Sequence, residues 1–293
     1  MIKSMTGFGK GEFTDGKRNV ICEIRAVNHR YSDISVKMPR RYAFAEEKIK
    51  SIVKETIKRG KIDVSVIVES ITEEDITIKL NTMVAKQYID NLNLLKKEFG
   101  LAGEISVQDV AVMPDVMKNT PDVEDEEEVT ASIEEALRTA VYNLDQMRIT
   151  EGQKLAEDLT MRGELVRKYV KQIEERAPEI VKEYTRKLYD RITELTDGLV
   201  DIPDDRILLE AAVFADKTNI TEELVRLDSH ITQLHQILGA GKSNGKKLDF
   251  LVQEMNREAN TIGSKANDSD ITSMVLEIKS EVEKIREQVQ NIE

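Results

Sequence analysis

Residues 246–271, KKLDFLVQEMNREANTIGSKANDSDI, contain side chains that could do chemistry. Glu254 and Glu258 stand four residues apart, so a helix would place both carboxylates on one face. Paired carboxylates can hold a hard divalent cation through oxygen, or act as general acid and base. Arg257 and Lys265 fall on the same side of this helix and could bind phosphates. The competing interpretation is a solvated helix face with ordinary ion pairs.

Two asparagines in this stretch favour the functional interpretation. Asn256 and Asn260 fall in the middle of the expected helix, although asparagine is a poor helix former. Helix propensity therefore gives no reason for either residue, which slightly favours a functional role for this helix face.

A second stretch, NITEELVRLDSHITQLHQIL at residues 219–238, carries a histidine near a carboxylate. Glu223, Arg226 and His230 share one face of the expected helix, away from its apolar stripe. A histidine placed one or two turns from a carboxylate can be a metal ligand or a general base. His235 is the weaker candidate, and a half-exposed polar residue without a function is the alternative for both histidines.

The stretch AVNHRYSD, residues 26–33, combines cations with an aromatic ring. Arg25 and Arg30 lie near the end of an expected strand, and Tyr31 could stack on a base. Such a cluster suits single-stranded nucleic acid. An ordinary polar strand end explains the same residues equally well.

Helical periodicity dominates the chain from about Val129 onward, so the first two candidate stretches are expected on helices. Pro178 indicates a helix boundary or a kink. Asn219 and Glu222 have capping-box spacing, which predicts a helix start. Apolar residues at helical spacing continue to the C-terminal end and require a partner helix, from this chain or another copy. Further helices are expected at residues 205–217, 221–238, 247–264 and 270–292.

The first seventy residues show strand signals instead. Apolar residues alternate over residues 20–26, 34–38 and 62–68, and helical spacing covers 44–59 and 82–99. The pattern predicts an α+β fold: a small antiparallel sheet with helices in a domain of residues 1–120, and a long helical part over 121–293. Gly7, Gly9 and Gly11 resemble no phosphate loop, so we expect them to permit a bulge or a close backbone approach.

Composition excludes several classes of protein. The formal charge of −12 argues against indiscriminate binding to nucleic acid, but it leaves a local basic cleft possible. The single cysteine, Cys22, excludes an intramolecular disulfide framework and a cysteine cage for zinc, and its alternation with Val20 and Ile24 predicts a buried strand residue. The sequence shows no membrane-spanning run and no signal peptide, so we expect a cytoplasmic protein.

Four segments resemble the signatures of the YicC/YloC family of endoribonucleases, and the resemblance extends over the whole chain. They are MIKSMTGFG at the start, EIRAVNHRYSD at 23–33, EELVRLDSH at 222–230 and LDFLVQEMNREANTIGSKANDSDI at 248–271. The resemblance implies a metal-dependent endoribonuclease that assembles as a ring-like homohexamer and closes around RNA. Asn219 departs from the aspartate expected there, which puts a metal role for that position in doubt.

The resemblance also implies roles for individual residues. The candidates for binding Mn²⁺ or Mg²⁺ are Glu223, His230, Glu254 and Glu258, with Glu254, Glu258 and His230 also catalytic. The candidates for RNA binding are Arg25, Arg30, Arg226, Arg257 and Lys265. A metal ion held by these carboxylates would polarise the scissile phosphate and lower the pKa of a bound water.

The expected function is hydrolytic cleavage of RNA with a divalent metal and without a nucleotide cofactor. If the 2′-hydroxyl of the RNA attacks instead, His230 could act as the base and the metal would be dispensable. The first alternative function is a non-catalytic RNA-binding or adaptor protein in RNA turnover. The second is a helical scaffold that uses its C-terminal apolar seam to oligomerise.

Overall fold

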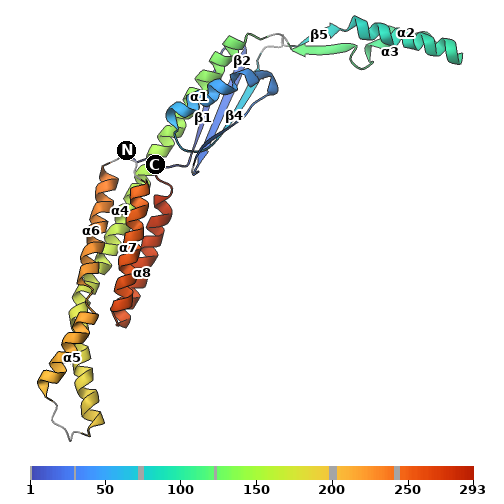
Figure 1. The fold of residues 1–293 in the computed structure, drawn as a ribbon. Helices are drawn as coiled ribbons and strands as arrows, with labels where there is room; N and C mark the ends of the chain where they lie inside the picture. The colour runs from blue at the N-terminus through green and yellow to red at the C-terminus, as the bar shows by residue number, and fades with distance from the viewer. Residues whose placement is uncertain (1, 30, 72–75, 122–123, 198–202, 241–244) are drawn as a thin grey trace.

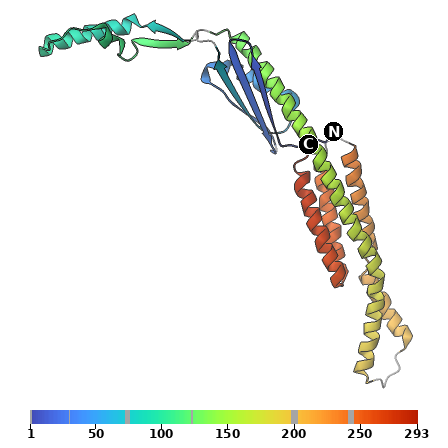
Figure 2. The ribbon, with the colours of Figure 1, turned by 180° about the vertical axis from the view of Figure 1, so that it is seen from behind.

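The computed structural model describes residues 2–29, 31–71, 76–121, 124–197, 203–240 and 245–293. The molecule is elongated, with a projecting arm, a sheet domain and a helical bundle arranged one after another (Figures 1 and 2). This architecture confirms the α+β class, with a small sheet in the N-terminal half and a long helical C-terminal part.

The sheet has four strands in the order β1–β2–β4–β3 and is mixed. β2 pairs antiparallel with both β1 and β4, whereas β3 pairs parallel with β4. The expectation of a purely antiparallel sheet was wrong at this edge. The helix α1 (Glu46–Thr56) follows β3 and returns the chain to the end where β3 began, which makes the next strand parallel. The strands are β1 (Gly7–Thr14), β2 (Arg18–Val27), β3 (Ser32–Lys37) and β4 (Gly60–Ser70).

One face of this sheet is buried against α1 and the first part of α4 (Glu126–Leu195). Alternate residues of β2, from Val20 to Ala26, point into this core, as their sequence pattern predicted. Cys22 is among them, and burial raises the pKa of its thiol to about 12. The prediction of a buried, structural cysteine is therefore confirmed.

Strand β1, which the sequence did not predict, owes its position to glycines. A Cβ on Gly9 would lie 2.0 Å from the backbone oxygen of Ala140, and one on Gly11 would lie 2.0 Å from that of Ala136. Only glycine allows α4 to rest directly on the strand at these points. The expected close approach of two backbones is thus confirmed, between β1 and α4.

Helix α4 has 70 residues and joins the sheet domain to the bundle (Figure 1). Its residues from Val129 to Leu144 pack in the sheet core, and those from Leu159 to Ile180 pack in the bundle core. The expected domain boundary at residue 120 therefore lies before the helix that both cores share. Of the two possibilities predicted at Pro178, a helix boundary or a kink, the boundary does not occur, because α4 continues through this residue to Leu195.

The bundle consists of the second part of α4 with α6, α7 and α8: α4 contacts α6 and α8, and α7 contacts the same two helices. α5 lies along the far part of α4 (Figure 1). The apolar seam of α8, from Ile271 to Val289, is buried in this core. Its partner helices therefore come from the same chain. In the part of the chain that the structure describes, no helix is both long and apolar enough to cross a membrane. The helices are α5 (Asp204–Lys217), α6 (Thr221–Gly239), α7 (Gly245–Lys265) and α8 (Ser269–Val289).

The arm projects from the sheet domain, away from the bundle (Figures 1 and 2). A two-stranded ribbon of β5 and β6 carries α2 and α3. Helical spacing over residues 82–99 predicted α2, but the sequence predicted neither strand. None of the described residues of α2 is buried, and Met83, Leu94, Leu95 and Phe99 are exposed. The elements are β5 (Ile76–Leu80), β6 (Met117–Pro121), α2 (Thr82–Phe99) and α3 (Val107–Ala111).

The two ends of the chain meet where the sheet domain joins the bundle. The Lys3 amide donates to the Glu293 carbonyl at 2.9 Å, and the Glu293 amide donates back to Lys3 at 2.8 Å. Arg148 of α4 is 2% exposed; its Nε donates to the Ser4 carbonyl at 2.6 Å, and its Nη2 pairs with the Glu293 carboxylate. An ion pair between the buried Arg148 and the half-buried Glu293 side chain, together with these hydrogen bonds, thus fastens both ends to α4.

Candidate metal centre

Helices α6 and α7 run antiparallel and in contact, and this pairing brings the two candidate stretches together. Apolar residues of both helices face the bundle core, which fixes the rotation of each helix about its axis. The polar residues beside these apolar stripes then meet along the contact. Lys265 lies against Glu223, and Glu258 lies near Arg226.

His230, Glu254 and Glu258 form one cluster. Each offers one ligand atom, and these three atoms lie within 4.8 Å of one another. Ligands around a small divalent cation are roughly 3–4 Å apart, so modest side-chain movement would let one ion touch all three. One histidine nitrogen and two carboxylate oxygens form a donor set that Mn²⁺ accepts.

The histidine of this cluster has a nitrogen that other described residues leave unsatisfied. His230 Nδ1 is buried and makes no hydrogen bond within the described part of the chain. A buried polar atom without a partner destabilises a protein, so such atoms commonly occur where a ligand or ion completes the site. The residues present therefore fit a metal ion.

Two arginines border the cluster. Arg226 Nη1 lies 3.7 Å from Glu258 Oε1, and Arg226 also pairs with Glu222. Arg257 Nη1 lies 3.7 Å from Glu254 Oε2, and its side chain is 73% exposed. Both contacts are longer than hydrogen bonds, so Nη1 of each arginine is available to a phosphate, whereas Arg226 Nη2 is already bound to Glu222.

Glu223 lies outside this cluster. Its Oε1 accepts a hydrogen bond from Lys265 Nζ at 2.7 Å, and Lys265 also reaches the Asn219 carbonyl at 3.3 Å. Burial acts to raise the pKa of Glu223, but the hydrogen bond and charge of Lys265, together with Arg226, hold that pKa below its ordinary value. The structure thus brings together three of the four predicted metal ligands and pairs the fourth with a predicted phosphate ligand.

The capping box expected at the start of α6 does not form. The Asn219 side chain accepts from the Thr221 amide at 3.0 Å, whereas Glu222 pairs with Arg226. Spacing alone could not predict this difference, because Arg226 offers Glu222 a charged partner one turn away.

The N-terminal candidates do not join this site within one chain. Arg25 is exposed on the uncovered face of the sheet, with its guanidinium 5.6 Å from the centre of the Phe8 ring. Strand β2 lies in the sheet domain, apart from α6 and α7 (Figures 1 and 2). Arg30 lies outside the described residues. The role of Arg25 in RNA binding stays a prediction.

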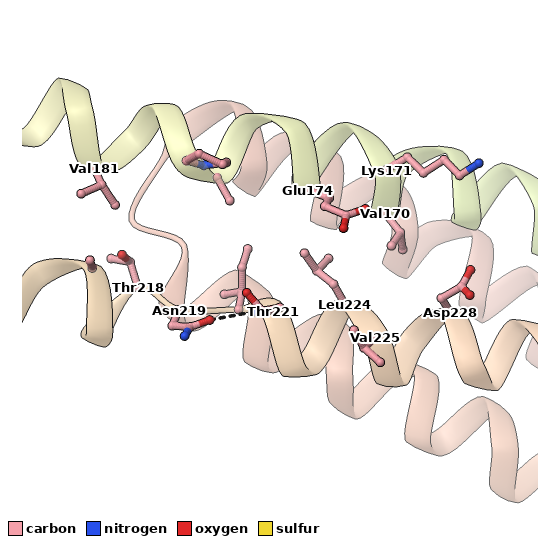
Figure 3. A pocket seen from close by; sticks show the side chains of 14 residues that line it. Val170, Lys171, Glu174, Val181, Thr218, Asn219, Thr221, Leu224, Val225 and Asp228 are labelled. Carbon is pink, nitrogen blue, oxygen red and sulfur yellow. Dashed lines mark hydrogen bonds between the residues drawn. The ribbon is translucent and has the colours of Figure 1, made fainter. Parts of the chain in front are cut away.

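A hollow that the sequence did not indicate lies between α4 and the start of α6 (Figure 3). Its volume is about 600 Å³, and apolar side chains such as Val170 and Leu224 line much of it. Its charged rim includes Asp228, which is already bound to Arg167 at 2.6 Å. The cluster of His230, Glu254 and Glu258 offers more groups that could hold a metal ion than the lining of this hollow does.

Comparison with known proteins covers nearly the whole chain. Residues 2–157 match the family model "Endoribonuclease YicC-like, N-terminal region", and residues 173–293 match "Endoribonuclease YicC-like, C-terminal". A "Probable endoribonuclease YicC" of Clostridioides difficile is 44% identical over 293 residues, covering 100% of both chains. A protein of the same name from Haemophilus influenzae is 32% identical over 297 residues, again covering 100% of both. The cluster on α6 and α7 falls within the C-terminal match.

Proposed function

Because the chain belongs to the family of YicC-like endoribonucleases, we propose that it cuts RNA within the strand, using a divalent metal ion held by His230, Glu254 and Glu258. The observation that carries the metal part of the proposal is the convergence of these three side chains from two helices. Arg226 and Arg257 stand beside the carboxylates, where they can bind the phosphates of the substrate.

The carboxylates of Glu254 and Glu258 differ in exposure, and this difference suits them to different roles. A bound Mn²⁺ or Mg²⁺ would polarise the scissile phosphate and supply an activated water. Glu258, with a side chain 5% exposed, is held in the helix interface and is suited to fixing the ion. Glu254, with a side chain 26% exposed, is accessible to water and suited to accepting a proton. The arginines offset charge that develops on the phosphate oxygens.

The proposed substrate is RNA and the proposed state is a homo-oligomer. A hexamer is the size that the family resemblance implies. The exposed apolar residues of α2 support assembly, because a helix with no buried face normally packs against a partner. A second copy of this chain is the proposed partner for the arm.

The proposal is tested with purified protein, RNA labelled at one end, and Mn²⁺. We expect new internal fragment ends, and we expect Glu254→Gln and Glu258→Gln each to abolish them while leaving RNA affinity and assembly nearly unchanged. Glu277→Gln is the matched control, since Glu277 is an exposed carboxylate of α8. Full activity in both site variants would discard the site. Binding without new ends would favour the non-catalytic adaptor.

The chemistry of the new ends separates two routes. Hydrolysis with a metal-bound water leaves no cyclic phosphate and stops in excess chelator. A 2′,3′-cyclic phosphate that still forms in excess chelator would support attack by the 2′-hydroxyl with His230 as base, and would refute the metal-dependent mechanism.

A further inference from the structure

A polar groove lies between α7 and α8, on the other side of α7 from the α6 contact that holds the metal cluster. Its volume is about 370 Å³, which falls in the range of small-ligand sites. Val252 and Val282 contribute apolar surface to it. The polar side chains that line it include Gln253, Asn256, Arg257, Asn260 and Arg286.

The amides of Asn256 and Asn260 are available to a ligand. The two residues stand four apart, so they share one face of α7. Neither side chain hydrogen-bonds to any residue that the structure describes. An asparagine inside a helix costs about 0.5 kcal/mol relative to alanine, so both are retained at some expense to the helix. A contact outside the chain would account for them.

The charges around the groove suit a nucleotide. Arg257 and Arg286 border it, against the single carboxylate of Glu283, which lies 3.4 Å from Arg286 Nη1. Arg257 also approaches Glu254 of the metal cluster at 3.7 Å. The same arginine therefore belongs to both sites, and only the exposed ridge of α7 separates them. A helix is about 10 Å across, a distance that one or two nucleotides of extended strand cover.

We infer that this groove binds an unpaired base next to the phosphate that is cut, and that it sets the sequence preference on one side of the cleavage site. The inference rests on the proposed function. The amides of Asn256 and Asn260 supply the paired donor and acceptor that read a base edge. Arg257 and Arg286 hold the adjoining phosphates or stack on the base. The position of the groove makes the neighbouring nucleotide, and not the scissile phosphate itself, its ligand.

The test compares the wild-type chain with the variant Asn256→Ala/Asn260→Ala on RNA oligonucleotides randomised around one cleavage site. Alanine favours the helix, so the variant is expected to fold. We expect the wild type to prefer one base at an adjoining position by about 10-fold, and the variant to reduce that ratio to about 2-fold. Mn²⁺ affinity is expected to stay unchanged. Gln172→Ala, an exposed helical amide of α4, is the matched control.

Binding to the same oligonucleotides in chelator gives a second measurement, independent of cleavage. Weaker binding by the double variant, by about 10-fold for the preferred base, supports the groove even if the wild type cuts no RNA. In that case the proposed activity fails and the base site stands. If wild type and variant bind the oligonucleotides equally and cut them in the same pattern, the groove does not bind a base. A wild type with no base preference also refutes the base-binding role. Neither result contradicts metal-dependent cleavage.

Discussion

The substitution His230→Leu should change the stability of the chain in opposite directions with and without metal. In chelator, the wild type carries a buried Nδ1 that makes no hydrogen bond within the described residues, and two carboxylates close to it. A buried polar atom without a partner costs about 1–3 kcal/mol. Leucine removes this atom, so we expect the variant to be more stable than the wild type by about 1 kcal/mol without metal.

Mn²⁺ should make the wild type more stable than His230→Leu, the reverse of their order in chelator. A ligand that binds only the folded state at 100 times its Kd stabilises that state by about 2.7 kcal/mol. The wild type should gain this free energy of unfolding, whereas His230→Leu, with one of three ligands lost, should gain almost none. The variant should therefore be less stable than the wild type in Mn²⁺ by about 1.7 kcal/mol, the difference between these two estimates.

Denaturant unfolding followed by circular dichroism, in chelator and in Mn²⁺, measures both signs. Glu277→Gln should behave as the wild type in both conditions, because its carboxylate is exposed and is not one of the three residues of the cluster. An equal gain from Mn²⁺ in wild type and His230→Leu would refute the assignment of this histidine as a ligand. A large loss of stability in chelator would refute the argument from the unsatisfied nitrogen.

Four further perturbations test other parts of the structure. Glu293→Gln should lower the free energy of unfolding by about 2 kcal/mol, because it leaves the buried Arg148 without its counter-ion. In a double-mutant cycle, Arg148→Met/Glu293→Gln should lower the free energy of unfolding by less than the sum of the two single changes. Burial acts to raise the pKa of Glu281, but hydrogen bonds from Lys284 and Arg162 outweigh this effect and hold that pKa below 4.5. The ionised Glu281 therefore stabilises the folded state above about pH 4.5, and this stabilisation is lost as the pH falls through the lowered pKa. Glu281→Gln should thus flatten the acid side of a stability–pH profile. Gly9→Ala should destabilise the sheet domain by about 3 kcal/mol or more, since the new Cβ would lie 2.0 Å from a backbone oxygen, whereas Gly239→Ala, with nothing within 4 Å, should be nearly neutral in the same thermal melt. Leu95→Asp in the arm should reduce the assembled mass measured by light scattering without changing the helix content, and an unchanged mass would exclude this face from assembly.

The helical part could be predicted from sequence because its apolar residues repeat at helical spacing and are satisfied within the chain. Residues such as Leu227, Met255 and Ile278 are fully buried, as their periodicity requires. The same periodicity placed His230, Glu254 and Glu258 beside the apolar stripes. It could not show that Arg257 lies at the border of the α8 groove while Glu258 is buried against α6, because that depends on two neighbouring helices at once.

The parts that escaped prediction depend on contacts distant in sequence. Strand β1 has glycines where a strand normally shows branched apolar residues, and only α4, more than a hundred residues later, explains them. The parallel pairing of β3 follows from the path of α1 and not from the strand itself. Pro178 ends many helices, but here the helix continues because packing in the bundle on both sides of the proline outweighs one lost hydrogen bond.

The helix shared by the two cores makes the molecule a lever. At about 1.5 Å per residue, the 70 residues of α4 span roughly 105 Å. The glycine contacts on β1 leave little room for the strand to slide on the helix, so a rocking of the sheet domain must carry the helix with it. A tilt of about 5° at one end would then displace the other by about 9 Å, which is comparable to the width of a helix. A small change in the orientation of the sheet domain would thus be magnified at the far tip of the bundle.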